Sequence, residues 1–310
     1  MRQFIIKISC WFFLFIFIYF IIGFAPFLIY DHSYPLYKSQ LEFIKSDSAE
    51  TLFIGDSRVN TSVIANNIPN SRNLGIPASC PIDGYFLLKK YLDNDKKVKN
   101  IFISYSWVNL GNQHNSIDIY RRGVLMGLYG YKEYMQILER SRLIDKEFNN
   151  KIIWINFISA FTRSPIFMGV ELKKFSFSNY KTNKEIYQLL NFQKGHITSI
   201  FGNESTCIDC KGFNARMQDF CIDPIYDYYL KELIQLCISN NIKVLFETIP
   251  FNRSSLTSNH VVTQYKQYLR QLTQLYPSAG ISDTIFYYDD KYYESTTHMN
   301  SSGAIEYTKY

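Results

Sequence analysis

The sequence lacks several features that would restrict its function at once. No run of lysine or arginine is dense enough to suggest a nucleic-acid-binding surface, although the net charge is +6 and the pI is about 8.8. The basic residues are scattered, as expected for solvated helix ends. Internal repeats and low-complexity linkers are absent from the sequence. We therefore expect one globular domain, since 310 residues are enough to bury a full hydrophobic core.

Cysteine and histidine are also scarce, with six and five residues respectively. Cys10 lies in an apolar run, and the other cysteines are Cys80, Cys207, Cys210, Cys221 and Cys237. The segment from Cys207 to Cys221 could supply three zinc ligands, but a second Cys-x-x-Cys pair is missing and no histidine is close enough to complete the site. We expect a local disulfide in this cluster rather than a metal, one buried unpaired cysteine, and no cofactor.

The chain does contain one long apolar run, from Ile8 to Tyr30, and an unusual number of aromatic residues, 25 Tyr and 25 Phe. Roughly 20 apolar residues span a bilayer as a helix. Because Arg2 and Lys7 precede the run, the positive-inside rule places the N-terminus in the cytoplasm. No small-x-small cleavage site follows the run, which favours a retained anchor over a removed signal peptide. Residues 1–30 are predicted to be a cytoplasmic terminus and single-pass membrane anchor, and residues 31–310 an extracytoplasmic domain.

Strand-like and helix-like segments alternate along this domain. Strands are predicted at 51–54, 71–76, 99–105, 242–249 and 284–288, and helices at 37–46, 59–66, 83–92, 226–240, 261–276 and 301–310. This spacing indicates a parallel sheet covered on both faces, a three-layer α/β/α (flavodoxin-like) architecture. The alternation is broken by a mostly helical insertion at 111–221, with helices predicted at 131–144 and 152–161. Such an insertion is either a lid, a substrate-binding subdomain or a structural cap.

The segment Gly55-Asp56-Ser57-Arg58 directly follows the first predicted strand. A serine on a strand-to-helix turn is held out of the core beside free backbone N–H groups, which can stabilise an oxyanion. The alternative is a plain tight turn, in which Asp56 or Ser57 caps the helix. His298 lies in the loop after the fifth predicted strand, and the topology would bring this loop to the same edge of the sheet as Ser57. A lone loop histidine is usually a polar surface residue, but two features that converge on one edge favour a site.

Three segments together resemble the SGNH/GDSL hydrolase superfamily: Gly55-Asp56-Ser57, Asn73-Leu74-Gly75 and His298-Met299-Asn300-x-x-Gly303-Ala304. They are most similar to its membrane-anchored extracytoplasmic members, such as O-acetyltransferases of exopolysaccharides and cell-wall polymers. The resemblance covers residues 49–110 and 223–310. It implies that Ser57 is the nucleophile, that His298 is the general base, and that the backbone N–H groups of Ser57 and Gly75 form the oxyanion hole. The side-chain donor that the family adds is assigned to Asn109, with Asn112 as the second candidate.

The sequence departs from the family in the residue that orients the histidine. The family pattern is Asp-x-x-His, but Ser295 stands three residues before His298. Glu294, one residue earlier, is the first candidate for the acid of the triad, and Asp289 and Asp290 are further candidates. A Ser-His dyad without an acid keeps part of the catalysis.

These features predict serine-dependent acyl transfer, of an O-acetyl or similar group, to or from a cell-surface or secreted polysaccharide. The expected partners are a glycan acceptor and a membrane protein that donates the acyl group. One alternative is a non-catalytic glycan-binding or assembly protein built on the same scaffold. Another is a membrane-associated lipid esterase whose insertion leans on the bilayer.

Overall fold

The computed structural model of the chain describes residues 2–23, 33–111, 127–128, 130–144, 177–197, 218–255, 258–282 and 284–309. The predicted helix at 152–161, Asn112, Cys207 and Cys210 lie outside these residues, so the predictions made for them stay predictions.

Five parallel strands form the main sheet, in the order β2-β1-β3-β4-β6. Their bounds are β1 Thr51–Gly55, β2 Ser71–Asn73, β3 Asn100–Ser104, β4 Lys243–Phe246 and β6 Ala279–Ile281. Strand β1 lies between β2 and β3, and its last residue, Gly55, is in register with Ser104 of β3. The predicted α/β class and parallel sheet are therefore confirmed.

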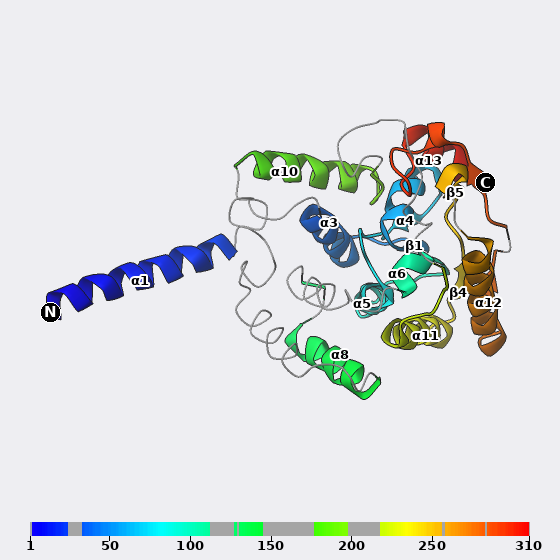
Figure 1. Cartoon of the computed structure of the whole chain (residues 1–310). Helices are drawn as coiled ribbons and strands as arrows, with labels where there is room; N and C mark the ends of the chain where they lie inside the picture. The colour runs from blue at the N-terminus through cyan, green and yellow to red at the C-terminus, as the bar shows by residue number, and fades with distance from the viewer. Residues whose placement is uncertain are drawn as a thin grey trace.

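The two faces of this sheet are covered unequally. Leu52 and Ile54 alternate with Phe53 along β1, and both are fully buried on the face that packs under α5 (Pro81–Leu92) and α11 (Pro224–Ser239). Phe53 is only half-buried on the opposite face, near α4 (Ser57–Ser62) and α13 (Ser301–Thr308). Figure 1 shows α4 and α13 on one side of β1, and α5 and α11 on the other. The arrangement has the three layers expected from the sequence.

The structure describes further helices besides those that cover β1. They are α1 (Arg2–Gly23), α3 (Ser33–Ser46), α6 (Trp107–Gly111), α8 (Tyr131–Ile144), α10 (Phe177–Phe192) and α12 (Asn259–Leu275), with short 3-10 turns η1 (Ala65–Asn67), η5 (Arg253–Ser255) and η6 (Asp290–Tyr292). Within the predicted insertion, α8 has the predicted bounds, and α10 was not predicted as a separate helix.

The prediction of the fifth strand was wrong. Residues 279–281, not 284–288, pair with β4 as β6, while Tyr287–Tyr288 (β7) pair with Phe251–Asn252 (β5) in a separate two-stranded sheet. The segment Ala279-Gly280-Ile281 has low strand propensity, whereas 284–288 is rich in aromatic residues. Pairing with the open edge of β4 overrides the local preference, because a tertiary ladder contributes more than intrinsic propensity.

The expected membrane-spanning helix over residues 8–30 was not found. Among the described residues no helix is both long enough and apolar enough to cross a bilayer. Helix α1 ends at Gly23, and residues 24–32 lie outside the described part. The apolar side chains of α1, from Phe4 to Ile18, are largely exposed, and Figure 1 shows the helix projecting from the domain.

Cys80 and Cys237 are buried free thiols, and Cys221 is an exposed free thiol. Burial raises the pKa of the Cys237 thiol to about 12, so this group stays protonated at neutral pH. The expected buried, unpaired cysteine is thus confirmed, although two residues fit the description. No cluster of three potential metal ligands occurs among the described residues.

Candidate active site

The turn between β1 and α4 is held rigidly by Asp56. This carboxylate is 1% exposed and caps α4, since Oδ1 accepts a hydrogen bond from the backbone N–H of Arg58 at 2.9 Å. Its second oxygen, Oδ2, accepts from the backbone N–H of Ser106 and from Nδ2 of Asn109, both at 2.9 Å. Asp56 therefore ties the end of β1 to the end of β3, and it serves as a brace rather than as a reacting group.

Gly55 is required because strands β1 and β3 approach each other closely at this residue. A Cβ at this position would lie 1.9 Å from the carbonyl oxygen of Ser104 and 2.5 Å from a methyl group of Val59. Only glycine allows β1 to run this close to β3 and then turn at once into α4. As a result, Ser57 starts α4 at the carboxyl end of the sheet, where the topology predicted a site.

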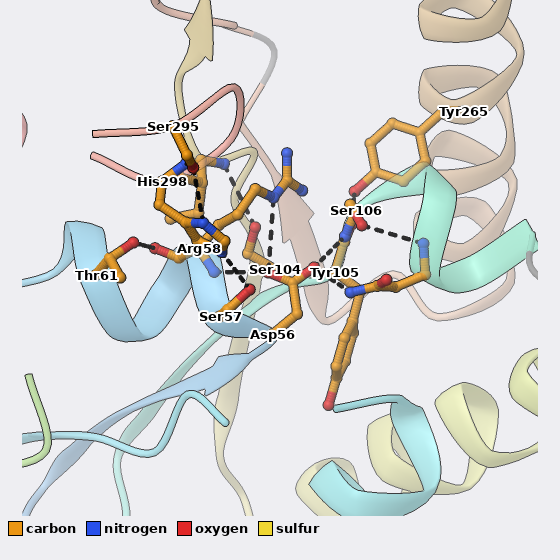
Figure 2. Close-up of polar contacts among 12 residues, drawn as sticks. Asp56, Ser57, Arg58, Thr61, Ser104, Tyr105, Ser106, Tyr265, Ser295 and His298 are labelled. Carbon is orange, nitrogen blue, oxygen red and sulfur yellow. Dashed lines mark hydrogen bonds and ion pairs between the residues drawn. The ribbon is translucent and has the colours of Figure 1, made fainter. Parts of the chain in front are cut away.

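His298 reaches Ser57 from the other end of the chain. Its Nε2 lies 2.8 Å from Ser57 Oγ, across 241 residues of sequence. The loop that carries it is closed by an antiparallel bridge between Tyr293 and Met299, both fully buried. The nucleophile and the base predicted from the sequence are therefore brought into direct contact (Figure 2).

Helix α13 explains the other residues of the histidine segment. Asn300 caps this helix, because its Oδ1 accepts from the backbone N–H of Gly303 at 3.0 Å. A Cβ on Gly303 would lie 2.2 Å from the carbonyl oxygen of Tyr292, so the helix could not pack against the η6 turn with a larger residue. These two positions fix the start of α13 and, through it, the loop of His298.

Ser295 occupies the position of the expected acid. Its Oγ lies 2.9 Å from His298 Nδ1 and also accepts the backbone N–H of His298 at 3.2 Å (Figure 2). An imidazole that donates from Nδ1 to this hydroxyl has its lone pair on Nε2, facing the Ser57 hydroxyl. The hydroxyl can accept from Nδ1 or donate to it, so it holds the ring in place without fixing the tautomer, and it brings no charge to stabilise an imidazolium.

The three candidate acids are placed differently. Glu294 is bound to the histidine through its backbone, whose N–H donates to the carbonyl of His298 at 3.0 Å, and its carboxylate oxygens are shielded from solvent. Asp289 is exposed and lies 3.4 Å from the guanidinium of Arg253. Asp290 accepts a hydrogen bond from Ser254 at 3.1 Å. The two aspartates are thus engaged with the η5 turn, while Glu294 lies within the histidine loop.

The expected oxyanion donors are only partly in place. The Ser57 N–H lies in the first turn of α4, where backbone donors have no intrahelical acceptor. Asn109 donates one hydrogen to Asp56, and its amide has a second. The Gly75 N–H, however, donates to Oδ1 of Asn73 at 2.9 Å, so its role as an oxyanion donor requires that this bond be released. Gly75 has a steric explanation as well, because a Cβ would lie 2.5 Å from the backbone nitrogen of Asn60.

A buried polar hub beneath α4 was not anticipated from the sequence. The Asn73 side-chain amide donates to the carbonyls of Val59 at 2.7 Å and Val63 at 2.8 Å, which closes the end of α4. Asn60 Nδ2 donates to the carbonyl of Gly195 at 2.6 Å, and Nδ1 of His196 lies 3.1 Å from the carbonyl of Asn60. Burial lowers the pKa of His196 to about 4, so this ring is neutral at pH 7. Asn60 and Asn73 stand among polar residues in the sequence, so no local signal marks them as buried groups that must hydrogen-bond.

Comparisons with known proteins leave the family open. No family model matches the chain, and no curated protein matches it significantly. The geometry of Ser57, His298 and Ser295 is therefore the basis for any statement about function.

Proposed function

We propose that this protein catalyses serine-dependent acyl transfer through an acyl-enzyme formed on Ser57. The observation that supports the proposal is the hydrogen-bonded chain from Ser57 Oγ to His298 Nε2, at 2.8 Å, and from His298 Nδ1 to Ser295 Oγ, at 2.9 Å. A nucleophile in contact with a base, and a base held by a third group, is the geometry of covalent acyl transfer.

In this mechanism the Ser57 oxygen attacks the acyl carbonyl while His298 Nε2 removes the hydroxyl proton. The tetrahedral oxyanion lies against the backbone N–H of Ser57 and the second amide hydrogen of Asn109. The intermediate collapses, and the imidazolium gives its proton to the leaving alcohol. An acceptor hydroxyl or water then gives a proton to Nε2 and attacks the acyl-enzyme, which releases Ser57.

The resemblance to SGNH/GDSL hydrolases directs the substrate proposal to an O-acyl group on a cell-surface or secreted polysaccharide. The glycan acceptor, the membrane acyl donor and the location outside the cytoplasm belong to the same proposal. The location rests on the apolar run at 8–30 and on the charges of Arg2 and Lys7. Protease protection of the full chain in intact cells and in lysed cells tests the location independently of activity.

The catalytic proposal is tested by labelling with a serine-reactive fluorophosphonate and by turnover of p-nitrophenyl acetate. We expect labelling of the wild type, none of Ser57→Ala, and a loss of turnover of at least ~10³-fold in Ser57→Ala and His298→Ala. Ser62→Ala is the matched control, because it removes another hydroxyl of α4 that is buried away from His298. Turnover in Ser57→Ala equal to that of the wild type would refute the proposal.

One observation favours a second candidate, a non-catalytic glycan-binding protein on the same scaffold. The group that accepts from His298 Nδ1 is a neutral hydroxyl, which does not stabilise an imidazolium as a carboxylate does. This candidate predicts glycan binding that is unchanged in Ser57→Ala, with no turnover and no fluorophosphonate labelling of the wild type.

A further inference from the structure

A cavity of about 730 Å³ lies on the less covered face of the sheet, between β1 and β3 on one side and α4 and α13 on the other. Its floor is the pair Phe53 and Phe102, whose rings stack with centroids 4.9 Å apart. Val59 of α4, Val63 just after this helix and Tyr307 of α13 form part of its wall. This volume and this mainly apolar lining are typical of sites for small molecules.

The cavity is distinct from the Ser57 site. Val59 follows Ser57 by two positions, which places the two side chains roughly 200° apart around the helix axis. The cavity therefore lies under α4, whereas the Ser57 hydroxyl faces His298 on the other side of the helix. Nothing in the proposed acyl transfer uses this space.

One acidic group, Glu247, lines the cavity. It continues the line of β4, since its backbone N–H donates to the carbonyl of Ile103 at 3.1 Å. The carboxylate is half-buried and accepts hydrogen bonds from the hydroxyls of Ser282 and Tyr307, the latter at 3.5 Å, and burial raises its pKa above the usual value despite these two bonds. Lys309 also lines the cavity, but it is exposed and pairs with Glu306 at 2.9 Å, and within the described part of the chain no ion pair joins a lysine or arginine to Glu247.

The two hydroxyls satisfy part of the hydrogen-bonding capacity of Glu247, but they are neutral and leave its charge to attract a cation. Aromatic rings next to such a carboxylate are the usual means of binding an organic cation, because the ring faces attract the positive charge and the acid neutralises it. Phe53, Phe102 and Tyr307 supply rings, and Glu247 supplies the charge.

We propose that this cavity binds a small organic ammonium compound with an apolar body, held by Glu247 and by the rings of Phe53, Phe102 and Tyr307. The ligand would lie between the sheet and the two helices that carry, or directly follow, Ser57 and His298. Because α4 and α13 are also joined by hydrogen bonds from Ile64 N–H to Thr308 Oγ1 at 3.1 Å and from Thr308 Oγ1 to the Ser62 carbonyl at 3.2 Å, occupancy would stabilise the pair as one unit.

Isothermal titration calorimetry on the full chain in a Ser57→Ala background tests this proposal independently of catalysis. The probes are benzyltrimethylammonium, choline, and 3,3-dimethylbutan-1-ol as the neutral equivalent of choline. We expect both cations to bind, the neutral alcohol to bind at least ~10-fold more weakly than choline, and Glu247→Gln to weaken binding of both cations by at least ~10-fold. Glu232→Gln, which changes an acid on α11 away from the cavity, should leave binding unchanged.

A second variant protects the test against a folding defect in Glu247→Gln. Phe102→Leu keeps an apolar side chain but removes a ring face, and it should weaken binding of benzyltrimethylammonium more than binding of the neutral alcohol. The proposal is overturned if neither cation binds at millimolar concentration. It is also overturned if choline and the neutral alcohol bind equally, or if both Glu247→Gln and Phe102→Leu bind the cations as tightly as the parent.

Discussion

Replacing Ser295 by aspartate would put a carboxylate on His298 Nδ1, where the structure has a hydroxyl. Ser295 Oγ now lies 2.9 Å from Nδ1 and accepts from the backbone N–H of His298 at 3.2 Å. A carboxylate can accept both bonds, since it has two oxygens and no proton to place. Ser295→Asp should therefore keep the tautomer and add a charge that stabilises the imidazolium formed during acyl transfer.

The size of the effect follows from the difference between a neutral and a charged hydrogen bond. A neutral bond contributes about 1 kcal/mol and a bond to a charged group about 1.5–3 kcal/mol, so the gain is about 1–1.5 kcal/mol at this half-buried site. That corresponds to a roughly 10-fold increase in kcat/KM. Since the base must be neutral and the added carboxylate favours the imidazolium, the acidic limb of the pH–rate profile should move to higher pH.

The assay is the pH dependence of kcat/KM for p-nitrophenyl acetate, measured for the wild type and for Ser295→Asp, Ser295→Ala and Glu294→Gln. Ser295→Ala should lose activity at all pH values, because Nδ1–H and one backbone N–H lose their acceptor. If Ser295→Asp and Ser295→Ala both match the wild type while Glu294→Gln loses most activity, the orienting residue is Glu294 and the reasoning is wrong.

Three further predictions concern the frame of the site. Gly55→Ala should destabilise the fold by about 3 kcal/mol, measured by urea unfolding, because its Cβ would lie 1.9 Å from the Ser104 carbonyl; stability within 1 kcal/mol of the wild type would contradict this. Asp56→Asn should reduce kcat by about 10-fold or more, because an amide cannot accept all three N–H bonds that Asp56 accepts. Fluorophosphonate should still label this variant. An unchanged kcat would show that Asp56 does not brace the site. The pKa of His196 is about 4 in the folded state and about 6.5 when unfolded, so the unfolded chain binds more protons between these values, and stability should fall by about 3 kcal/mol from pH 6.5 to pH 4. His196→Asn should flatten this part of the stability–pH curve, and an unchanged slope would assign it to other groups.

The sequence was most informative where short-range chemistry determines the structure. An apolar strand followed by Gly55-Asp56-Ser57 predicts the β1–α4 turn, and the order of the elements predicts that His298 returns to the same edge. What could not be predicted depends on contacts between distant segments. Strand β6 forms where pairing with β4 is available rather than where propensity is high, and Asn60 is buried against Gly195 from far along the chain.

The residue that holds the histidine illustrates the same limit. The sequence favours Glu294, because the residue that orients a catalytic histidine is expected to be an acid. Ser295, three residues before His298, does not fit that expectation. In the structure the loop closes so that the hydroxyl of Ser295, three residues before His298, makes the hydrogen bond to Nδ1. The spacing was therefore informative about which position contacts the ring, but not about the functional group found there.

The contact between Asn60 and Gly195 has a consequence for how this protein can be divided. Residues 194–197 lie within the insertion and are hydrogen-bonded both to the end of β2 and to the helix that starts with Ser57. The carbonyl of Lys194 accepts from the N–H of Asn73, and the N–H of Ile197 donates to the carbonyl of Asn60 at 3.2 Å. Gly195 adopts a φ of +89°, and a Cβ there would lie 1.9 Å from the carbonyl of Asn73, so the attachment tolerates no other residue. The insertion is therefore not a removable module. A shortened chain would have to keep residues 194–197 in place, because the nucleophile's own helix is fastened from that side.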